Sequence, residues 1–108
     1  MFYLEKNLIP YLIYARDFEN RDEAREHIRE AHRDHLRSIG DKLLTAGALL
    51  DDDGNVMGGI SLIDTDDQAE AERFAYNDPY AKAGIRKETQ VLRWRKRWWE
   101  GEFLLTDL

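Results

Sequence analysis

Cysteine is absent from this sequence, and its absence removes several kinds of chemistry. A chain without cysteine has no disulfide framework, no thiolate nucleophile and no cysteine-based zinc site. Proton transfer near neutral pH is left to three histidines, His27, His32 and His35. Because an isolated imidazole has a pKa of ~6.5, any acid–base catalysis near neutral pH is expected to centre on one of these side chains.

Long apolar runs and an excess of basic residues are also missing. No apolar run approaches the ~20 residues that a membrane-spanning helix needs. Residues 1–15 lack a basic leader and a small-residue cleavage site, so we expect no signal peptide. The net charge of −6 argues against broad nucleic-acid binding, which needs a basic surface. We therefore expect a cytoplasmic protein that binds neither membranes nor nucleic acids.

Motifs for cofactors and metals are equally scarce. The chain has no GxGxxG or Walker sequence. The acidic stretch DDDGN, residues 51–55, is too short for an EF-hand loop and lacks its spaced ligands. The pair His32 and His35 could contribute to a metal site, but no third ligand with matching geometry is visible. The stretch RWRKRWW, residues 93–99, mixes cations with stacking surfaces, yet a strand of period two explains the same residues. The sequence thus predicts no cofactor and no metal.

Hydrophobic patterning predicts four strands. Residues 9–15 form a compact apolar run typical of a buried strand, and residues 42–50 and 56–64 form two strands joined by a tight hairpin at Gly54. Two glycines in the second of these, Gly58 and Gly59, suggest a bulge or a close approach of another group. Residues 88–99 alternate as a fourth strand, and the residues expected on one face are Leu92, Trp94 and Trp98.

Two helices are predicted between these strands. The first begins at Asn20, whose spacing to Glu23 is that of a capping box, and ends at Gly40. The second follows a similar Thr65–Gln68 spacing and ends at Asp78-Pro79, because proline disfavours helical geometry in the preceding residue. The expected inner stripe of the first helix is Ala24, Ile28, Ala31, His35 and Ile39, with His32 and Leu36 beside it. That of the second helix is Ala71, Phe74 and Ala75.

The order strand, helix, strand, strand, helix, strand predicts an α+β, ferredoxin-like βαββαβ domain. Its antiparallel sheet would carry two helices on one face, and residues 1–108 would form a single domain. The uncovered face, carrying tryptophan, would be a large apolar patch on a monomer. We therefore expect a homodimer, or a higher homo-oligomer, paired sheet to sheet.

Four stretches occur in an order that resembles one family: LIYARD, REAH, GDKLLTAGALLDDDG and NDPYAKAG. Together they resemble the YCII-related (YciI-like) family over residues 11–94, leaving 1–10 and 95–108 as extensions. The resemblance implies a domain that pairs as a dimeric α+β barrel, with a histidine and an aspartate in its pocket. It further implies a lyase- or isomerase-like enzyme acting on a small cyclic or enolisable substrate, as in a dehydrochlorinase of a chlorinated hydroxyquinone.

The same resemblance names candidate site residues. It implies His32 as the catalytic acid or base, with Asp17 or Asp78 as the carboxylate that orients it. We favour Asp17, because it leaves the end of a buried strand. Arg29 would bind an anionic or enolic oxygen of the substrate, and Tyr80 would line the pocket or merely pack.

Each candidate also has a plainer interpretation. Spacing alone favours a core histidine at His32, and Asp78 could simply bind backbone amides of the turn that follows it. His35 stands where relatives often carry an aromatic residue, so we expect it to pack, and Arg25 is expected at a solvated edge. The second hypothesis is a non-catalytic module that binds a small ligand or another protein on the same scaffold. The absence of a carboxylate within hydrogen-bond reach of His32 would favour it.

Overall fold

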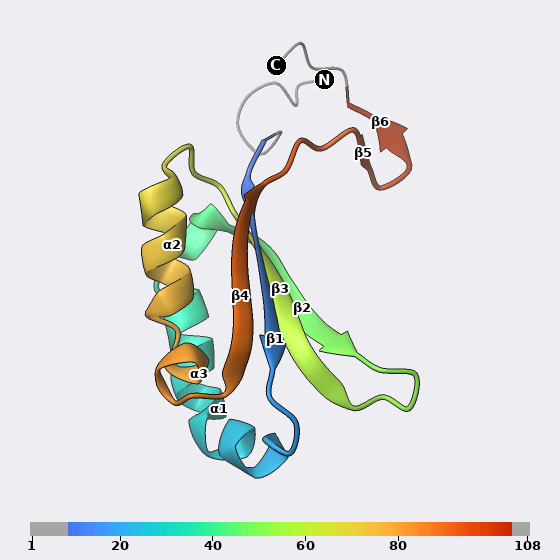
Figure 1. Ribbon diagram of the computed structural model, residues 1–108. Coiled ribbons are helices and arrows are strands. Elements are labelled where there is room, and N and C mark those ends of the chain that lie inside the picture. The colour runs from blue at the N-terminus through green and yellow to red at the C-terminus, as the bar shows by residue number, and fades with distance from the viewer. Residues whose placement is uncertain (1–8, 105–108) are drawn as a thin grey trace.

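The computed structural model describes residues 9–104 of the chain. Its elements in chain order are β1 (Tyr11–Asp17), α1 (Asp22–Arg37), the 3₁₀ turn η1 (Gly40–Lys42), β2 (Leu43–Leu50), β3 (Val56–Ile63), α2 (Gln68–Tyr76), α3 (Pro79–Lys82), β4 (Arg86–Arg93), β5 (Trp98–Trp99) and β6 (Glu102–Phe103). The first four strands form one antiparallel sheet in the order β2-β3-β1-β4. This is the predicted α+β, ferredoxin-like fold, with the short α3 added (Figure 1).

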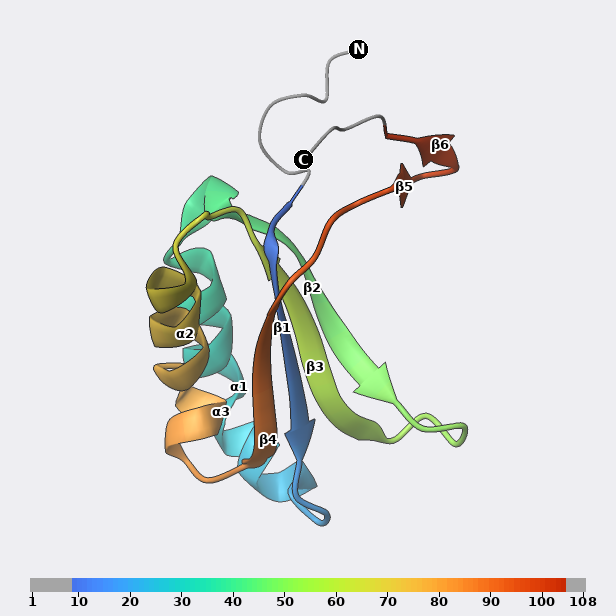
Figure 2. The same ribbon diagram turned by 45° about the horizontal axis from the view of Figure 1, so that its top comes forward.

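The helices lie together on one face of this sheet (Figure 1 and Figure 2). No helix of the described residues covers the opposite face. None of these helices is long and apolar enough to cross a membrane. Most of the predicted N-terminal extension, and the last four residues of the C-terminal one, lie outside the described residues.

The hydrophobic core lies between α2 and the centre of the sheet. Its buried members are Ile13, Ile63, Phe74 and Ala75, and the partly buried apolar side chains around them are Leu36, Ile39, Leu43 and Val91. The predicted inner stripe of α2 is therefore confirmed. Helix α1 differs, since none of its residues is fully buried and Ala31, expected inside, is exposed. Leu36 of this helix packs against the core, and the helix also forms one wall of a cavity.

Both predicted capping boxes are wrong. Asn20 adopts a left-handed backbone (φ 61°), so the chain is still turning there and α1 begins at Asp22 without a side-chain cap. In α2 the cap is Asp67, whose carboxylate accepts a hydrogen bond from the Ala69 amide at 2.9 Å. The Thr65 hydroxyl instead accepts a hydrogen bond from the Asp67 amide.

The last predicted strand is too long. Strand β4 ends at Arg93, and Trp98 lies in the separate β5–β6 pair rather than on the main sheet. The Trp94 amide still donates to the Pro10 carbonyl at 3.0 Å. Pro10 has no amide hydrogen and cannot donate a hydrogen bond back to Trp94, so the pairing of β1 with β4 ends there.

The hairpin between β2 and β3 is confirmed. The Asp51 carbonyl accepts a hydrogen bond from the Gly54 amide, and Gly54 has a positive φ of 87°.

The expected close approach occurs at Gly58. A Cβ added there would lie 2.0 Å from the Ala15 carbonyl oxygen, well inside any van der Waals contact. Strands β1 and β3 can therefore pair here only because position 58 has no side chain.

We expect Gly58→Ala to lower the free energy of unfolding by about 3 kcal/mol or more, because the clash is with backbone that cannot move aside. Gly47→Ala is the matched control, since the space around a Cβ at Gly47 is open and its φ is not positive. The control should change stability by about 1 kcal/mol or less. Urea denaturation of both variants measures the difference, and equal stabilities would contradict the steric argument.

Candidate active site

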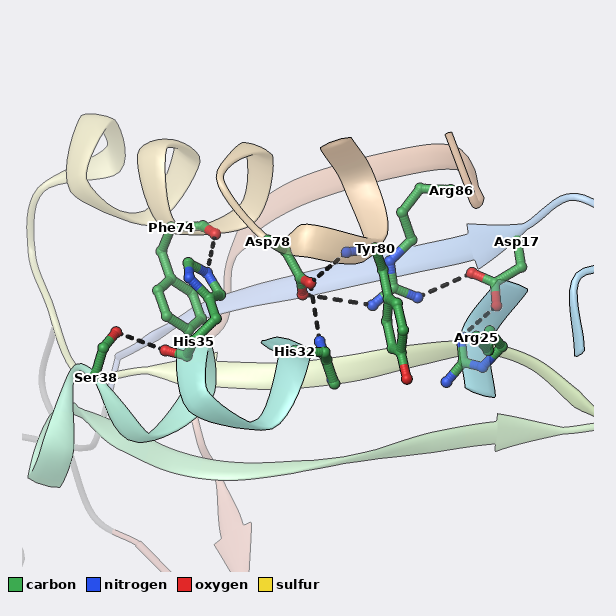
Figure 3. Close-up of polar contacts among 9 residues, drawn as sticks. All are labelled: Asp17, Arg25, His32, His35, Ser38, Phe74, Asp78, Tyr80 and Arg86. Atoms are coloured by element: carbon green, nitrogen blue, oxygen red, sulfur yellow. Dashed lines mark hydrogen bonds and ion pairs between the residues drawn. The ribbon is translucent and has the colours of Figure 1, made fainter. Parts of the chain in front are cut away.

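His32 of α1 and Asp78 form a hydrogen-bonded pair. The His32 Nδ1 atom lies 2.9 Å from Asp78 Oδ1, and the two side chains are 18% and 11% exposed. A carboxylate can only accept, so Nδ1 carries the proton and donates it (Figure 3). In the neutral ring the lone pair is then on Nε2, the nitrogen available to act as a base.

Asp78 is held by the turn that follows α2. It caps the short helix α3, and its Oδ1 atom also accepts a hydrogen bond from the Tyr80 amide at 2.9 Å. The Asp78 carboxylate therefore both caps α3 and binds His32. Burial alone would raise the pKa of Asp78, but the hydrogen bonds from His32 and Tyr80, with the charge of Arg86, outweigh it. The pKa of Asp78 consequently lies below its usual range.

Tyr80 fixes the plane of the His32 ring. The two rings stack with centroids 4.1 Å apart and planes at 18°. The Arg25 guanidinium carbon lies 4.3 Å from the Tyr80 centroid, and Figure 3 shows Tyr80 between His32 and Arg25. Tyr80 is therefore buried against the imidazole and does not line the cavity described below.

Asp17 does not contact His32, and the preference for it as the partner is wrong. Its carboxylate, 3% exposed, accepts hydrogen bonds from Arg25 Nη1 and from Arg86 Nη1. The Arg86–Asp17 distance is 2.9 Å, and Arg86 Nη2 lies 3.7 Å from Asp78 Oδ2. Arg86 therefore joins the two aspartates, while His32 is bound by Asp78 alone (Figure 3).

Arg25 and Arg29 of α1 lie in environments opposite to those predicted for them. Arg25, expected at a solvated edge, is largely buried against Asp17 and Tyr80. Arg29, expected to bind substrate, is 45% exposed and pairs with Glu26 on the same helix. Because Arg29 does not line the cavity described below, its placement does not support the predicted binding role.

Arg86 is the site residue that the sequence analysis missed. It begins β4, directly opposite Asp17 at the end of β1. An aspartate at the end of a buried strand needs a cation beside it, and the first charged residue of a neighbouring strand is a natural source. The sequence contains both charged residues, but only the register of β1 with β4 places them opposite each other.

A cavity of about 410 Å³ lies between α1, the end of α2 and the sheet. This volume falls in the range typical of small-molecule pockets. Its polar lining includes Arg25, His32, Ser61, Asp78, Arg86 and Thr89. Its apolar wall includes Ile13, Leu36 and Phe74, and its floor is made of small residues, Ala15, Ala46, Ala48 and Gly59. The hydrogen-bonded pair His32 and Asp78 thus lines a space that can hold a small ring.

His35 packs, as predicted. Its Nε2 atom donates to the Phe74 carbonyl at 2.7 Å, and its ring stacks on that of Phe74 at 4.2 Å.

His27 is exposed. Within residues 9–104, no group of three histidine, aspartate or glutamate side chains is arranged to hold a metal ion. Of the three histidines, His32 is therefore the one whose imidazole is hydrogen-bonded to a carboxylate.

Comparisons with known proteins bear on the family and the fold of this chain. The sequence profile of the YCII-related domain matches residues 9–95. A similar solved structure is the 5-chloro-2-hydroxyhydroquinone dehydrochlorinase of Burkholderia phenoliruptrix AC1100, in complex with 2,5-dihydroxybenzoquinone. The two are 28% identical, the match covers 80% of this chain and 93% of the dehydrochlorinase, and the TM-score is 0.72. No curated protein matches at a significant level.

The depressed pKa of Asp78 predicts a pH-dependent contribution to stability. A carboxyl whose pKa is lower in the folded than in the unfolded state stabilises the fold above its unfolded value of about 3.9. This stabilisation is lost as pH falls through the folded-state pKa. We expect Asp78→Asn to reduce the free energy of unfolding by about 1–3 kcal/mol at pH 7 and by less at pH 3.

Urea denaturation at several pH values measures this difference. Asp34→Asn removes an exposed carboxylate from α1 and controls for the loss of one negative charge. A stability loss for Asp78→Asn that did not shrink in acid would show that its ionised form is not what stabilises the site.

Proposed function

The chain belongs to the YCII-related domain family, and from that membership we propose that it is a small-molecule enzyme using His32 and Asp78 as an acid–base pair. The reaction is an elimination or isomerisation on a small cyclic or enolisable substrate. The observation that carries this proposal is the 2.9 Å hydrogen bond from His32 Nδ1 to Asp78 at the wall of the cavity. A carboxylate within reach of the histidine favours an enzyme over a non-catalytic binding module.

The chemistry needs only groups that this chain has. His32 Nε2 takes a proton from a carbon beside a carbonyl, or from a ring hydroxyl in the keto tautomer of a hydroxyhydroquinone, and the electron pair of the broken C–H or O–H bond moves into the conjugated system. In an elimination that pair then expels a leaving group, which departs with the electrons of its own bond. In an isomerisation the imidazolium returns the proton to another carbon. The Asp78 carboxylate stabilises the imidazolium between the two steps.

The similar solved structure supports the substrate class. That enzyme is named for dehydrochlorination of a chlorinated hydroxyhydroquinone, and its structure contains a dihydroxybenzoquinone. A ring of this size fits a cavity of about 410 Å³ with a floor of alanine and glycine. Halogenated hydroxyhydroquinones are therefore the first substrates to test.

We further propose that two copies pair through the sheet face that no helix covers. Leu12, Tyr14 and Leu92 lie on this face around a shallow groove, and Leu92 is exposed. The rest of the groove is polar, with Arg16, Lys87, Glu88 and Gln90. Such a face on a monomer would leave apolar side chains in water. Pairing of two sheets would remove them from it.

Leu92→Glu should shift the protein from dimer to monomer, because it places a charge in the apolar contact. Tyr76→Glu is the matched control, since Tyr76 is also exposed but lies on α2. Light scattering after size-exclusion chromatography measures the mass of each variant. A wild-type monomer, or a Leu92→Glu dimer, would contradict pairing through this face.

His32→Gln should lower the turnover of any substrate by about 10²–10⁴-fold, the usual contribution of a general acid or base. Chloride release from 5-chloro-2-hydroxyhydroquinone is the first assay. His27→Gln controls for loss of an exposed imidazole from the same helix and should retain turnover. Undiminished turnover in folded His32→Gln would refute the acid–base pair and leave the binding module as the better explanation.

A further inference from the structure

Arg86 presents a buried but incompletely bonded guanidinium to the cavity. Its side chain is only 10% exposed, and Nη1 donates to Asp17. The Nη2 atom lies 3.7 Å from Asp78 Oδ2, beyond hydrogen-bond distance. Within the described part of the chain, Nη2 makes no hydrogen bond. A buried donor of this kind usually has a partner, so it indicates a place for a ligand acceptor.

The sheet beneath Arg86 leaves room for such a ligand. A Cβ built at Gly59 would lie 3.9 Å from Arg86 Nη2 and 4.0 Å from Nη1, so the guanidinium lies above a position with no side chain. The inward residues paired with Gly59 on either side are Ala15 and Ala48, and both are small. The guanidinium therefore borders open cavity rather than packed side chains.

The charges around the cavity favour an anion. Its lining contains three guanidinium groups, Arg25, Arg33 and Arg86, and one carboxylate, Asp78. Asp17 offsets part of this charge from behind Arg25 and Arg86 and does not line the cavity. Guanidinium groups bind planar oxyanions through paired N–H donors, more strongly than they bind neutral acceptors.

We propose that Arg86 binds an anionic oxygen of the substrate, with Arg25 as a second cation. The ligand class is a small planar ring carrying a carboxylate or an ionised ring hydroxyl. Asp17 is then a positioning residue that holds both guanidinium groups rather than a catalytic acid or base. This inference rests on the proposed function, because an anionic oxygen beside Arg86 would place the ring between the cation and His32. Charge that develops on that oxygen during proton abstraction would be stabilised there.

Benzoate and benzamide are matched probes, since they share shape and differ in charge at neutral pH. We expect benzoate to bind wild-type protein at least about tenfold more tightly than benzamide. Isothermal titration calorimetry at pH 7 measures both affinities. Equal affinities, or no binding of benzoate, would overturn the proposal. Because no turnover is involved, this result is independent of whether His32 acts as a base.

Variants locate the anion within the cavity. Arg86→Gln should abolish the preference for benzoate, whereas Arg29→Gln, an exposed arginine of α1 outside the cavity, should keep it. Should Arg86→Gln fail to fold, Arg86→Lys retains the charge without the fork of donors and should weaken benzoate binding several-fold. Asp17→Asn should weaken benzoate without changing benzamide affinity. An unchanged preference in folded variants at Arg86 would place the anion elsewhere and refute the assignment.

Discussion

The Asp78 carboxylate is the contact on which the site depends, because it joins three parts of the fold. It caps α3, fixes the proton of His32 on α1 and faces Arg86 on β4. The turn after α2 brings it there, and Pro79 defines where that turn ends and α3 begins. A buried carboxylate is costly unless it is hydrogen-bonded, and here each neighbour that lowers its pKa also positions part of the site.

The second buried carboxylate, Asp17, extends this arrangement across the sheet. Two guanidinium groups satisfy it, and one of them also approaches Asp78. Tyr80 is packed between the His32 ring and Arg25, so the His32–Asp78 pair and the cations share one aromatic support. Buried ion pairs contribute little net stability, but here they fix the positions of the side chains that line the cavity.

The cavity exists because packing is uneven along the sheet. Ile13, Phe74 and Ala75 belong to the core cluster and also line the cavity, so the packed core forms one wall of it. On β2, β3 and β1, the paired residues Ala48, Gly59 and Ala15 are small and leave open space beneath α1, which has no buried residue. The open space therefore lies directly beside the packed core, above the small residues of the sheet.

The sequence by itself determined the order of the elements, the buried stripe of α2, the hairpin at Gly54 and the family. It also indicated that His35 packs. All of these features depend on the spacing of residues close together in the sequence. It placed His32, Asp78 and Tyr80 among the candidates, yet it favoured Asp17 as the partner and missed Arg86. Only the tertiary structure decided these points, because Asp17 and Arg86 are 69 residues apart and meet through the β1–β4 register. Which carboxylate reaches the histidine depends on how α1 lies over the turn before α3, and no local pattern encodes that distance.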